Sequence, residues 1–321
     1  MNKRSFVKLL AGVAMAGIAT LPALGQDLTP VRVGYIADYF GTSMVAIATD
    51  QGLWAKHGLE AQLSVFTNGP IQVQALGAGS LDFAYIGPGA LWLPASGQAK
   101  VIAINALGYT DRVIAQPGIE SIEDLRGKRV AVPEGTSGDM LLRLALDAAG
   151  MSVDDVEVVS MDPSTIVTAF ASGQVDGAGI WYPFVDVIRQ RVSDLNELSS
   201  NEDFFPEVAF PSSFIVSNAK ADDEATIRKM NAVIKEALDY RRENLDASVQ
   251  ITAAFLGVPV EPLAAEAPQA RLPSSEELEA LSADGSVDGW LDTLAGLYVD
   301  FGRISDPLPA SQFYLSQYYA D

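Results

Sequence analysis

The sequence predicts an α/β protein built as two lobes, and three features support this fold class. Short apolar runs of strand-like composition alternate with segments of helical periodicity from residue 31 to residue 181. This pattern occurs twice in succession, and a helical C-terminal third follows it. The expected strands are residues 31–36, 63–66, 83–86, 129–132, 156–159 and 177–181, and the expected helices are residues 43–54, 71–78, 138–149 and 164–171.

The two halves of this pattern share motifs at one fixed spacing. Gly41-Thr42-Ser43 recurs 94 residues later as Gly135-Thr136-Ser137. Self-similarity over a domain-sized distance predicts two lobes of similar topology. The same spacing relates a second group, in which Ala75, Gly79, Asp82, Ala84 and Ile86 correspond to Ala169, Gly173, Asp176, Ala178 and Ile180.

Two segments are suited to connect the lobes. Residues 105–111, which include Gly108, would form the first crossing, and the extended residues 208–216 would form the second. We expect the C-terminal helices to pack on the first lobe and the Pro- and acid-rich residues 258–273 to form a loop. The expected helices are residues 224–244, 247–255, 274–283 and 287–301, and the expected lobes are residues 26–107 with 214–321 and residues 108–213.

The first 25 residues have the pattern of a secretory signal peptide. Lys3, Arg4 and Lys8 surround the start of an apolar run, which a small-residue site at residues 23–25 follows. The apolar run is too short for a membrane span, which needs about 20 residues. We expect cleavage between Gly25 and Gln26 and export to the periplasm by the Sec or the twin-arginine route. Because no Cys follows the run, we expect no lipid anchor.

Composition disfavours several classes of function. Without the three basic residues of the leader, 18 Lys and Arg stand against 41 Asp and Glu, a net charge of −23, so nucleic acid is not an expected partner. The sequence has no Cys for disulfides or thiol catalysis. Its single His, His57, precedes Gly58 in a pattern typical of a helix C-terminus. One His without Cys does not form a usual zinc site, so we expect no catalytic centre, no metal and no cofactor.

Four loops that follow expected strands contain the candidate ligand-binding residues. Open α/β sheets bind ligands at the carboxyl ends of their strands, and helix N-termini can hold an anion through backbone N–H groups. Each loop also has a purely structural interpretation, since Gly-Thr-Ser is a good helix N-cap and Trp181 with Tyr182 suits a packed aromatic pair. The candidates are Asp38, Tyr39, Phe40, Thr42, Gly87, Pro88, Gly89, Gly135, Thr136, Ser137, Asp139, Trp181 and Tyr182.

Four segments distributed along the chain form a specific combination of motifs. They are residues 51–59 (QGLWAKHGL), 75–84 (ALGAGSLDFA), 122–133 (IEDLRGKRVAVP) and 173–183 (GQVDGAGIWYP). The combination resembles the periplasmic binding proteins of the nitrate, sulfonate and taurine ABC transport systems over nearly all of the chain after the leader. The resemblance implies a type II periplasmic-binding-protein fold, with two crossings between the lobes and closure on a solute that is passed to the permease.

Among these proteins the chain is most similar to the taurine-binding members, which implies taurine or a related small sulfonate as the solute and a monomeric protein. The chain has Pro88, Gly89 and Ala90 where relatives often have hydroxyl groups, so backbone N–H groups would contribute more to binding a sulfonate. The second crossing, with Pro211-Ser212-Ser213, lacks the carboxylate expected to meet an ammonium group. The groups that could take this role are Asp38, Asp139, Glu207 and the face of Trp181.

Other functions within and outside this class remain open. An alkanesulfonate, nitrate or a thiamine-precursor pyrimidine would suit the same role in transport. Enzymes that make the thiamine pyrimidine share the fold, but they need reactive His and Lys residues and a cytoplasmic cofactor, which a single His and an export signal disfavour. The sensing domain of a receptor would need a membrane segment or a fused signalling domain, and the sequence pattern shows neither.

Overall fold

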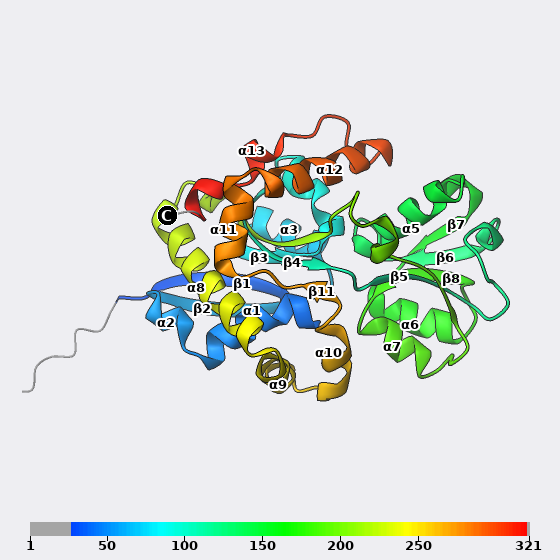
Figure 1. The fold of residues 1–321 in the computed structure, drawn as a ribbon, viewed down its shortest axis with the longest axis horizontal. Helices are drawn as coiled ribbons and strands as arrows, with labels where there is room; N and C mark the ends of the chain where they lie inside the picture. The colour runs from blue at the N-terminus through cyan, green and yellow to red at the C-terminus, as the bar shows by residue number, and fades with distance from the viewer. Residues whose placement is uncertain (1–26, 320–321) are drawn as a thin grey trace, which may run out of the picture.

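The computed structural model describes residues 27–319, which form two lobes lying side by side (Figure 1). Each lobe has a central β-sheet with helices on both faces, so the predicted α/β class is confirmed. The predicted signal peptide and its cleavage site at Gly25 and Gln26 lie outside the described residues. Within the described residues, no helix combines the length and apolar character that crossing a membrane requires.

The sheet of the first lobe combines strands from both ends of the chain. β1 is parallel to its neighbours β2 and β3, whereas β10 returns antiparallel between β3 and β4. The spatial order is β11-β4-β10-β3-β1-β2. These strands are β1 (Thr29–Ile36), β2 (Leu59–Phe66), β3 (Phe83–Ile86), β4 (Ala99–Gly108), β10 (Pro211–Ser217) and β11 (Ala270–Arg271).

The sheet of the second lobe repeats this arrangement. Its order is β7-β6-β8-β5-β9, and the parallel trio β7-β6-β8 has the same topology as β2-β1-β3. The residues of β3 precede those of β8 by the 94 positions found in the sequence, so the expected duplication of topology is confirmed. The strands are β5 (Asp111–Ala115), β6 (Arg129–Val132), β7 (Glu157–Ser160), β8 (Gly177–Trp181) and β9 (Asn196–Ser200).

Helices cover both sheets, and the C-terminal helices pack on the first lobe as expected. Ile227, Val249 and Leu291 share one apolar core with Val33 of β1. The helices of the first lobe are α1 (Tyr39–Asp50), α2 (Leu53–Lys56), α3 (Gly69–Gly77), α4 (Trp92–Ala95), α8 (Glu224–Glu243), α9 (Leu245–Leu256), α10 (Val260–Glu266), α11 (Ser275–Ala283), α12 (Ser286–Asp300) and α13 (Ala310–Phe313), and those of the second are α5 (Ser137–Ala148), α6 (Pro163–Ala171) and α7 (Phe184–Arg189).

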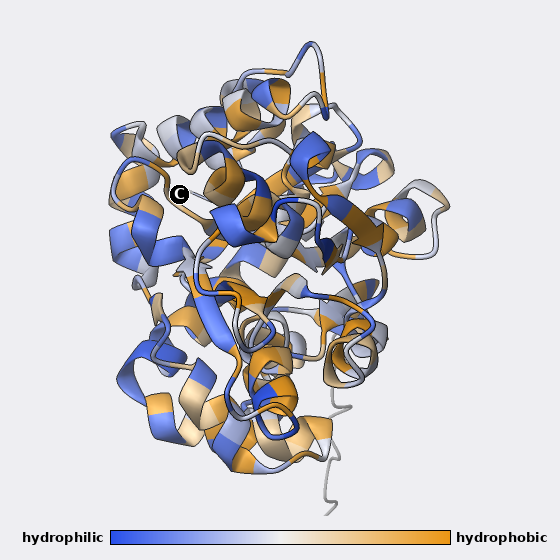
Figure 2. Ribbon diagram, turned by 90° about the vertical axis from the view of Figure 1, so that its right-hand side faces the viewer, coloured by the Kyte–Doolittle hydropathy of each residue, from blue (hydrophilic) through white to orange (hydrophobic). Residues whose placement is uncertain are grey.

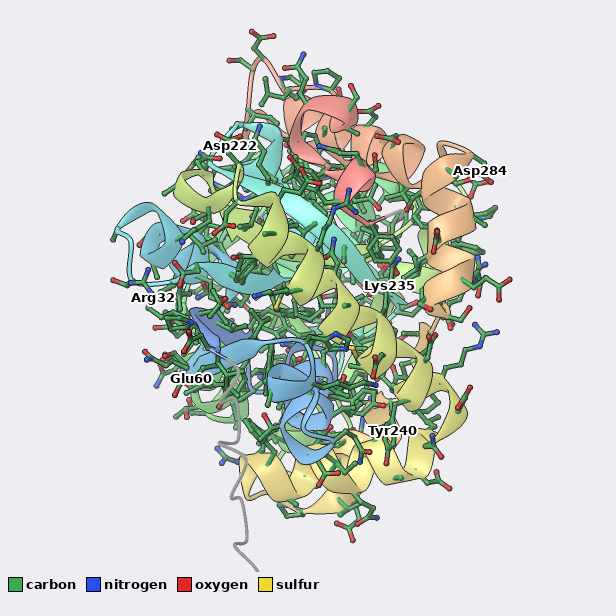
Figure 3. The ribbon with its side chains drawn as sticks, turned by 90° about the vertical axis from the view of Figure 1, so that its left-hand side faces the viewer. Arg32, Glu60, Asp222, Lys235, Tyr240 and Asp284 are labelled. Atoms are coloured by element: carbon green, nitrogen blue, oxygen red, sulfur yellow. The ribbon has the colours of Figure 1, made fainter. Side chains whose placement is uncertain are left out.

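Hydrophobic and hydrophilic residues alternate along these helices (Figure 2), as expected of helices that bury one face. On the outer face of the first lobe, α8 runs across the surface and carries Lys235 (Figure 3). The ammonium group of Lys235 lies 3.5 Å from the carboxylate of Glu279 on α11. Charged side chains therefore pair on this outer surface, while the apolar residues form the core behind them.

Two differences from the sequence-based predictions affect the site. Helix α1 begins at Tyr39 rather than at residue 43, because the Asp38 side chain accepts the Gly41 N–H at 2.5 Å and caps the helix. Residues 258–273 were expected to form a loop, and this expectation is wrong: they contain α10 and β11. Proline is tolerated in a first helical turn, and Leu263 and Glu266 are buried at helical spacing, so Pro259 starts the helix instead of preventing it.

The chain passes between the lobes at two places. The first crossing is Tyr109 and Thr110, between β4 and β5. The second leads from η4 (Asn201–Phe204) to β10, whose first residue, Pro211, pairs with Leu107 of β4. Pro211 therefore already belongs to the sheet of the first lobe, whereas the sequence predicted that the second lobe extends to residue 213. The remaining 3₁₀ turns are η1 (Pro88–Ala90), η2 (Glu123–Leu125), η3 (Val153–Asp155), η5 (Asn218–Lys220) and η6 (Ser316–Tyr318).

Candidate ligand-binding site between the lobes

A cavity lies between the lobes at the carboxyl ends of β1, β3 and β8. The space inside it that the centre of a water molecule can occupy is about 50 Å³. One water molecule needs about 10–15 Å³ by this measure, so the cavity has room for a small solute or a few waters. It is lined by Ile36, Asp38, Phe40, Asn68, Gly69, Tyr85, Gly87, Pro88, Ala90, Gly108, Thr110, Asp111, Thr136, Ser137, Trp181, Ser212 and Glu266.

The wall formed by the first lobe contains two carboxylates at the N-terminus of α1. Asp38 caps the helix through Gly41. Both carboxylate oxygens of Glu266 lie within hydrogen-bond distance of the Tyr39 N–H, at 3.2 and 3.1 Å. Helix N-termini attract negative charge, and here the protein's own acids already occupy that position. The N-terminus of α1 is therefore not free to hold an anionic group of a ligand.

The two copies of the Gly-Thr-Ser motif consequently have different environments. In the first copy the Thr42 hydroxyl donates to the Ile36 carbonyl at 2.6 Å, and Ser43 contacts the buried guanidinium of Arg241. In the second copy Thr136 and Ser137 line the cavity, because Thr136 is the N-cap of α5 and stands one turn closer to the helix end. Only the second copy faces the cavity.

The wall formed by the second lobe has an unpaired acceptor beside an unpaired donor. Asp111 of β5 and Trp181 of β8 are directly opposite each other in an antiparallel pair. Asp111 Oδ1 and Trp181 Nε1 are both buried and form no hydrogen bond of normal geometry within the described residues, and the Trp181 N–H faces the Asp38 carboxylate, whose pKa burial raises and this N–H lowers in part. Buried polar atoms are nearly always satisfied, so two adjacent exceptions in a cavity wall are suited to contact a ligand.

Burial dominates the electrostatics of the cavity. It raises the pKa of Asp38 to about 7, against the effect of the Gly41 N–H, and the nearby Asp111 raises it further. Burial also raises the pKa of Asp111 to about 6, while the Ser137 hydroxyl and the Arg112 guanidinium oppose the rise. The pKa of Glu266 lies well above its ordinary value, first through burial and then through the charge of Asp38.

A buried cation behind the cavity positions part of its wall. Arg241 donates to the side-chain oxygen of Asn105 at 2.9 Å and to its carbonyl at 2.6 Å. The Asn105 side-chain N–H group in turn donates to the carbonyl of Phe40 at 3.1 Å and to the hydroxyl of Ser212 at 3.2 Å. Phe40 and Ser212 line the cavity. Burial lowers the pKa of Arg241 to about 10, which leaves the guanidinium charged at neutral pH.

The lobes are closed on each other beside the cavity. A Cβ atom at Gly89 of η1 would lie 1.9 Å from the backbone nitrogen of Ser137 in the second lobe, so glycine permits this approach. Arg303, which follows α12 in the first lobe, pairs with Glu134 at 2.9 Å and with Asp139 at 3.1 Å in the second lobe. These two ion pairs span the lobe boundary.

Further contacts accompany these ion pairs. The indole Nε1 of Trp92 donates to the Gly135 carbonyl at 3.2 Å, and the guanidinium of Arg303 stacks over the Trp92 ring at 5.3 Å. The Tyr298 hydroxyl, on α12, donates to the Pro88 carbonyl of its own lobe at 2.7 Å and lies 3.2 Å from the sulfur of Met140 on α5 of the second lobe. We call Trp92, Tyr298 and Arg303, with their contacts in the second lobe, the interlobe clasp.

The structure distributes the predicted site residues among three environments. Asp38, Phe40, Gly87, Pro88, Thr136, Ser137 and Trp181 line the cavity. Gly89, Gly135 and Asp139 line a smaller space beside the interlobe clasp. Tyr39 and Thr42 are buried in the first lobe, and Tyr182 packs in the second with its ring under the guanidinium of Arg112. Glu207, a possible partner for an amine, is exposed and lies outside the cavity lining.

Sequence reasoning missed Glu266 and Asp111, the two acids of the cavity other than Asp38. Glu266 was hidden in the segment expected to be a loop, although Leu263, Glu266 and Ala267 have the spacing of one helical face. Asp111 was assigned to the first crossing, although an acid two residues before the apolar run Val113–Ala115 is a recognisable signal. The other missed residues, among them Asn68, Tyr85 and Ser212, come together only through tertiary folding.

No group of three or more His, Asp and Glu side chains in residues 27–319 is arranged to hold a metal ion. His57 is the C-cap of α2, and its Nε2 atom lies 2.9 Å from Glu236 Oε1 on α8. This residue lies outside the lining of the cavity. The structural role expected for His57 at a helix end agrees with this position.

Solved structures of related shape confirm the bilobal periplasmic-binding-protein fold. The ligand-binding component of an ABC-type import system of Staphylococcus aureus, with zinc bound, has a TM-score of 0.74 at 14% identity, over 91% of this chain and 98% of that chain. The alkanesulfonate-binding protein of Xanthomonas axonopodis bound to MOPS has a TM-score of 0.71 at 19% identity, over 90% and 98%. An enzyme, the desulfurization enzyme DSZB, has a TM-score of 0.66 at 15% identity, over 91% and 97%. The fold alone therefore does not separate binding proteins from enzymes.

Sequence comparison identifies the family. A Brucella abortus protein, described by its name as a binding protein without a stated ligand, is 55% identical over 321 residues, 99% of each chain. The taurine-binding periplasmic protein of Escherichia coli is 31% identical over 128 residues, 39% of this chain and 40% of that protein. The model of the NMT1/THI5-like family matches residues 41–247. With a two-lobed fold closed around one cavity, the chain belongs to the NMT1/THI5-like family.

Proposed function

We propose that this protein is the periplasmic solute-binding component of an ABC importer, which captures taurine or a related small sulfonate between its lobes and delivers it to the permease. The observation that carries this proposal is a cavity enclosed by both lobes, with an unpaired donor, Trp181 Nε1, and an unpaired acceptor, Asp111 Oδ1, in its wall. A binding protein needs such a cavity because contacts to both lobes favour the closed state when the solute is present.

The groups suited to a sulfonate lie on the second lobe. The N-terminus of the 12-residue helix α5 reaches the cavity at Thr136 and Ser137, and a helix N-terminus favours an anion. Trp181 Nε1 could donate to a sulfonate oxygen from the neighbouring strand. Taurine has an ammonium group at the opposite end, and the carboxylates of the cavity are suited to that group.

Other solutes fit this wall less completely. Nitrate and simple alkanesulfonates offer nothing to the three buried carboxylates. A thiamine-precursor pyrimidine has ring nitrogens that bind carboxylic acids, so it is the second candidate. The enzymes of this fold that make the thiamine pyrimidine need reactive His and Lys residues, and the lining of the cavity contains neither among the described residues.

A thermal-shift screen of the mature protein tests this function. A ligand that binds only the native state raises the melting temperature, because it stabilises that state by RT ln(1 + [L]/Kd). The panel contains taurine, alkanesulfonates of two to six carbons, nitrate and thiamine-precursor pyrimidines. We expect taurine to give the largest shift. No shift with any sulfonate, together with a shift with a pyrimidine, would replace taurine by the second candidate.

A further inference from the structure

Three carboxylates from both lobes meet at the cavity without forming an ion pair within the described residues. Asp38 and Glu266 belong to the first lobe and Asp111 to the second, and their exposed fractions are 6%, 1% and 2%. Every ion pair found within the described residues involves other acids. A buried carboxylate without a counter-ion is costly, so three in one cavity need a physical explanation.

The protein itself does not supply the missing positive charge. Arg241 is fully buried behind the cavity, but its hydrogen bonds go to Ser43 and Asn105. Arg112, next to Asp111, donates to the Asp111 carbonyl, Tyr109, Glu197 and Gln269, and its guanidinium forms no ion pair with the Asp111 carboxylate among the described residues. A metal ion does not fit either, since these acids do not form one of the clusters of three that could ligate a metal in the described residues.

We propose that a protonated nitrogen of the solute is the counter-ion of Asp38, Asp111 and Glu266, so that the cavity selects ammonium-bearing solutes and the lobes close fully only with that positive charge between them. This inference rests on the proposed function, because it assigns a chemical class to the same solute. The like charges face each other across the cleft: Asp111, on the second lobe, is close enough to raise the pKa of Asp38 on the first. Bringing the lobes together therefore brings negative charges together, and a cation between them removes the repulsion.

The unpaired oxygen of Asp111 supports this assignment independently of charge. An ammonium group has three N–H donors and no acceptor. Asp111 Oδ1 offers an unused acceptor, and the two oxygens of Glu266 face the backbone N–H groups of Tyr39 and Phe40, which leaves lone pairs of this carboxylate without a donor. The cavity thus offers acceptors from both lobes to a donor-rich group, whereas a sulfonate has only acceptors to present to them.

Titration calorimetry with matched solutes tests the selectivity. Taurine, ethanesulfonate and ethanolamine separate the contributions of the ammonium and sulfonate groups. We expect taurine to bind at least thirtyfold more tightly than ethanesulfonate, and ethanolamine to bind measurably. If ethanesulfonate binds as tightly as taurine, the inference is overturned while the sulfonate function stands. If ethanolamine binds and taurine does not, the sulfonate function fails while the inference stands.

Charge-removing variants test the coupling to closure without depending on the solute. Asp111→Asn and Glu266→Gln keep the side-chain shapes, and Glu261→Gln, exposed on the same helix as Glu266, is the matched control. By small-angle scattering at pH 8, we expect both cavity variants without solute to have a smaller radius of gyration than the parent protein, and the control to equal the parent. An unchanged radius in both variants, with circular dichroism showing them folded, would overturn the inference even if every solute in the panel failed to bind.

Discussion

Two groups of carboxylates meet at the boundary between the lobes, and they differ in their counter-ions. Glu134 and Asp139 of the second lobe are both paired with Arg303 of the first, and Asp139 also pairs with Arg143 at 2.8 Å. The cavity acids, represented by Asp111, form no ion pair within the described residues, and burial raises the pKa of Asp111 although the charge of Arg112 opposes that rise. The first group joins the lobes through the protein's own charges, whereas the second leaves the opposing charge to a ligand.

This difference in counter-ions explains how closure of the lobes can depend on a solute. The interlobe clasp lies beside the cavity and forms whenever the lobes meet, so it favours closure without discriminating between solutes. The cavity acids oppose closure until a solute enters. A ligand can shift an open–closed equilibrium only by its differential affinity for the two states, and the unpaired group provides that difference.

The largest effect is expected from blocking closure itself with Gly89→Ala. The new Cβ atom would lie 1.9 Å from Ser137 N and 2.0 Å from the carbonyl carbon of Thr136, which are backbone atoms that cannot move aside. The interlobe clasp and the contacts of the solute with both lobes would then be lost together. We expect Kd to rise at least a hundredfold by calorimetry. Gly77→Ala is the control, because nothing lies within 4 Å of its Cβ position. A Gly89→Ala variant that binds with parental affinity would show that binding does not require this arrangement.

The next effect concerns Trp181, which lines the cavity and packs edge-on against Phe184 with ring centroids 5.9 Å apart. Trp181→Ala should weaken binding by about 2 kcal/mol, roughly thirtyfold in Kd, as buried aromatic anchors typically do. Trp181→Phe keeps most of the packing and removes the unpaired Nε1 donor, so it should cost about tenfold. A variant with a lowered melting temperature but unchanged affinity would restrict Trp181 to packing within the second lobe.

A third effect is a dependence of affinity on pH. The pKa values of Asp38 and Asp111, about 7 and about 6, mean that both acids are largely protonated at pH 5 in the protein without solute. An ammonium-bearing solute must displace these protons, so Kd should fall as pH rises from 5 to 7.5, by up to tenfold per pH unit for each proton released. Calorimetry in buffers of different ionisation enthalpy would measure that release.

The stability of the protein without solute should change in the opposite direction. The folded-state pKa values of these acids lie above the ordinary value of 3.8 for Asp, so the folded state binds more protons than the unfolded chain between pH 4 and pH 7. Their contribution to the free energy of unfolding therefore becomes more favourable as pH falls through that window. The solute-induced rise in melting temperature should become smaller over the same range. A Kd that is constant between pH 5 and 7.5 would count against ionised cavity acids as the binding groups.

The sequence predicted the scaffold of this site better than its chemistry. Strands β3 and β6 have the expected bounds because apolar composition and flanking glycines determine buried strands locally. The duplication indicated two similar lobes, and the helix N-termini after both Gly-Thr-Ser loops were candidates to hold an anion, whereas the N-terminus of α1 is occupied by acids. One of those acids, Glu266, comes from a helix more than 200 residues further along the chain. Local patterns do not report which distant carboxylate approaches a helix end, because tertiary packing determines it.

The smallest effect is expected from the interlobe clasp, through Arg303→Ala. The variant loses two ion pairs across the lobe boundary and the stacking on Trp92. Because Glu134 is largely exposed, its pair contributes little, whereas Asp139 is buried and retains Arg143 as its counter-ion. We therefore expect a rise in Kd of about fivefold, with no change in solute selectivity, since Arg303 lies outside the lining of the cavity.

Stopped-flow measurements would show whether Arg303→Ala changes the association or the dissociation rate of the solute. The clasp forms only when the lobes meet, so its loss should accelerate solute dissociation and leave the association rate nearly unchanged. Arg126→Ala is the matched control, because Arg126 pairs with Asp155 entirely within the second lobe. If Arg303→Ala instead altered the preference for taurine over ethanesulfonate, the paired and unpaired carboxylates would form one connected site, and the separation between joining the lobes and recognising the solute would fail.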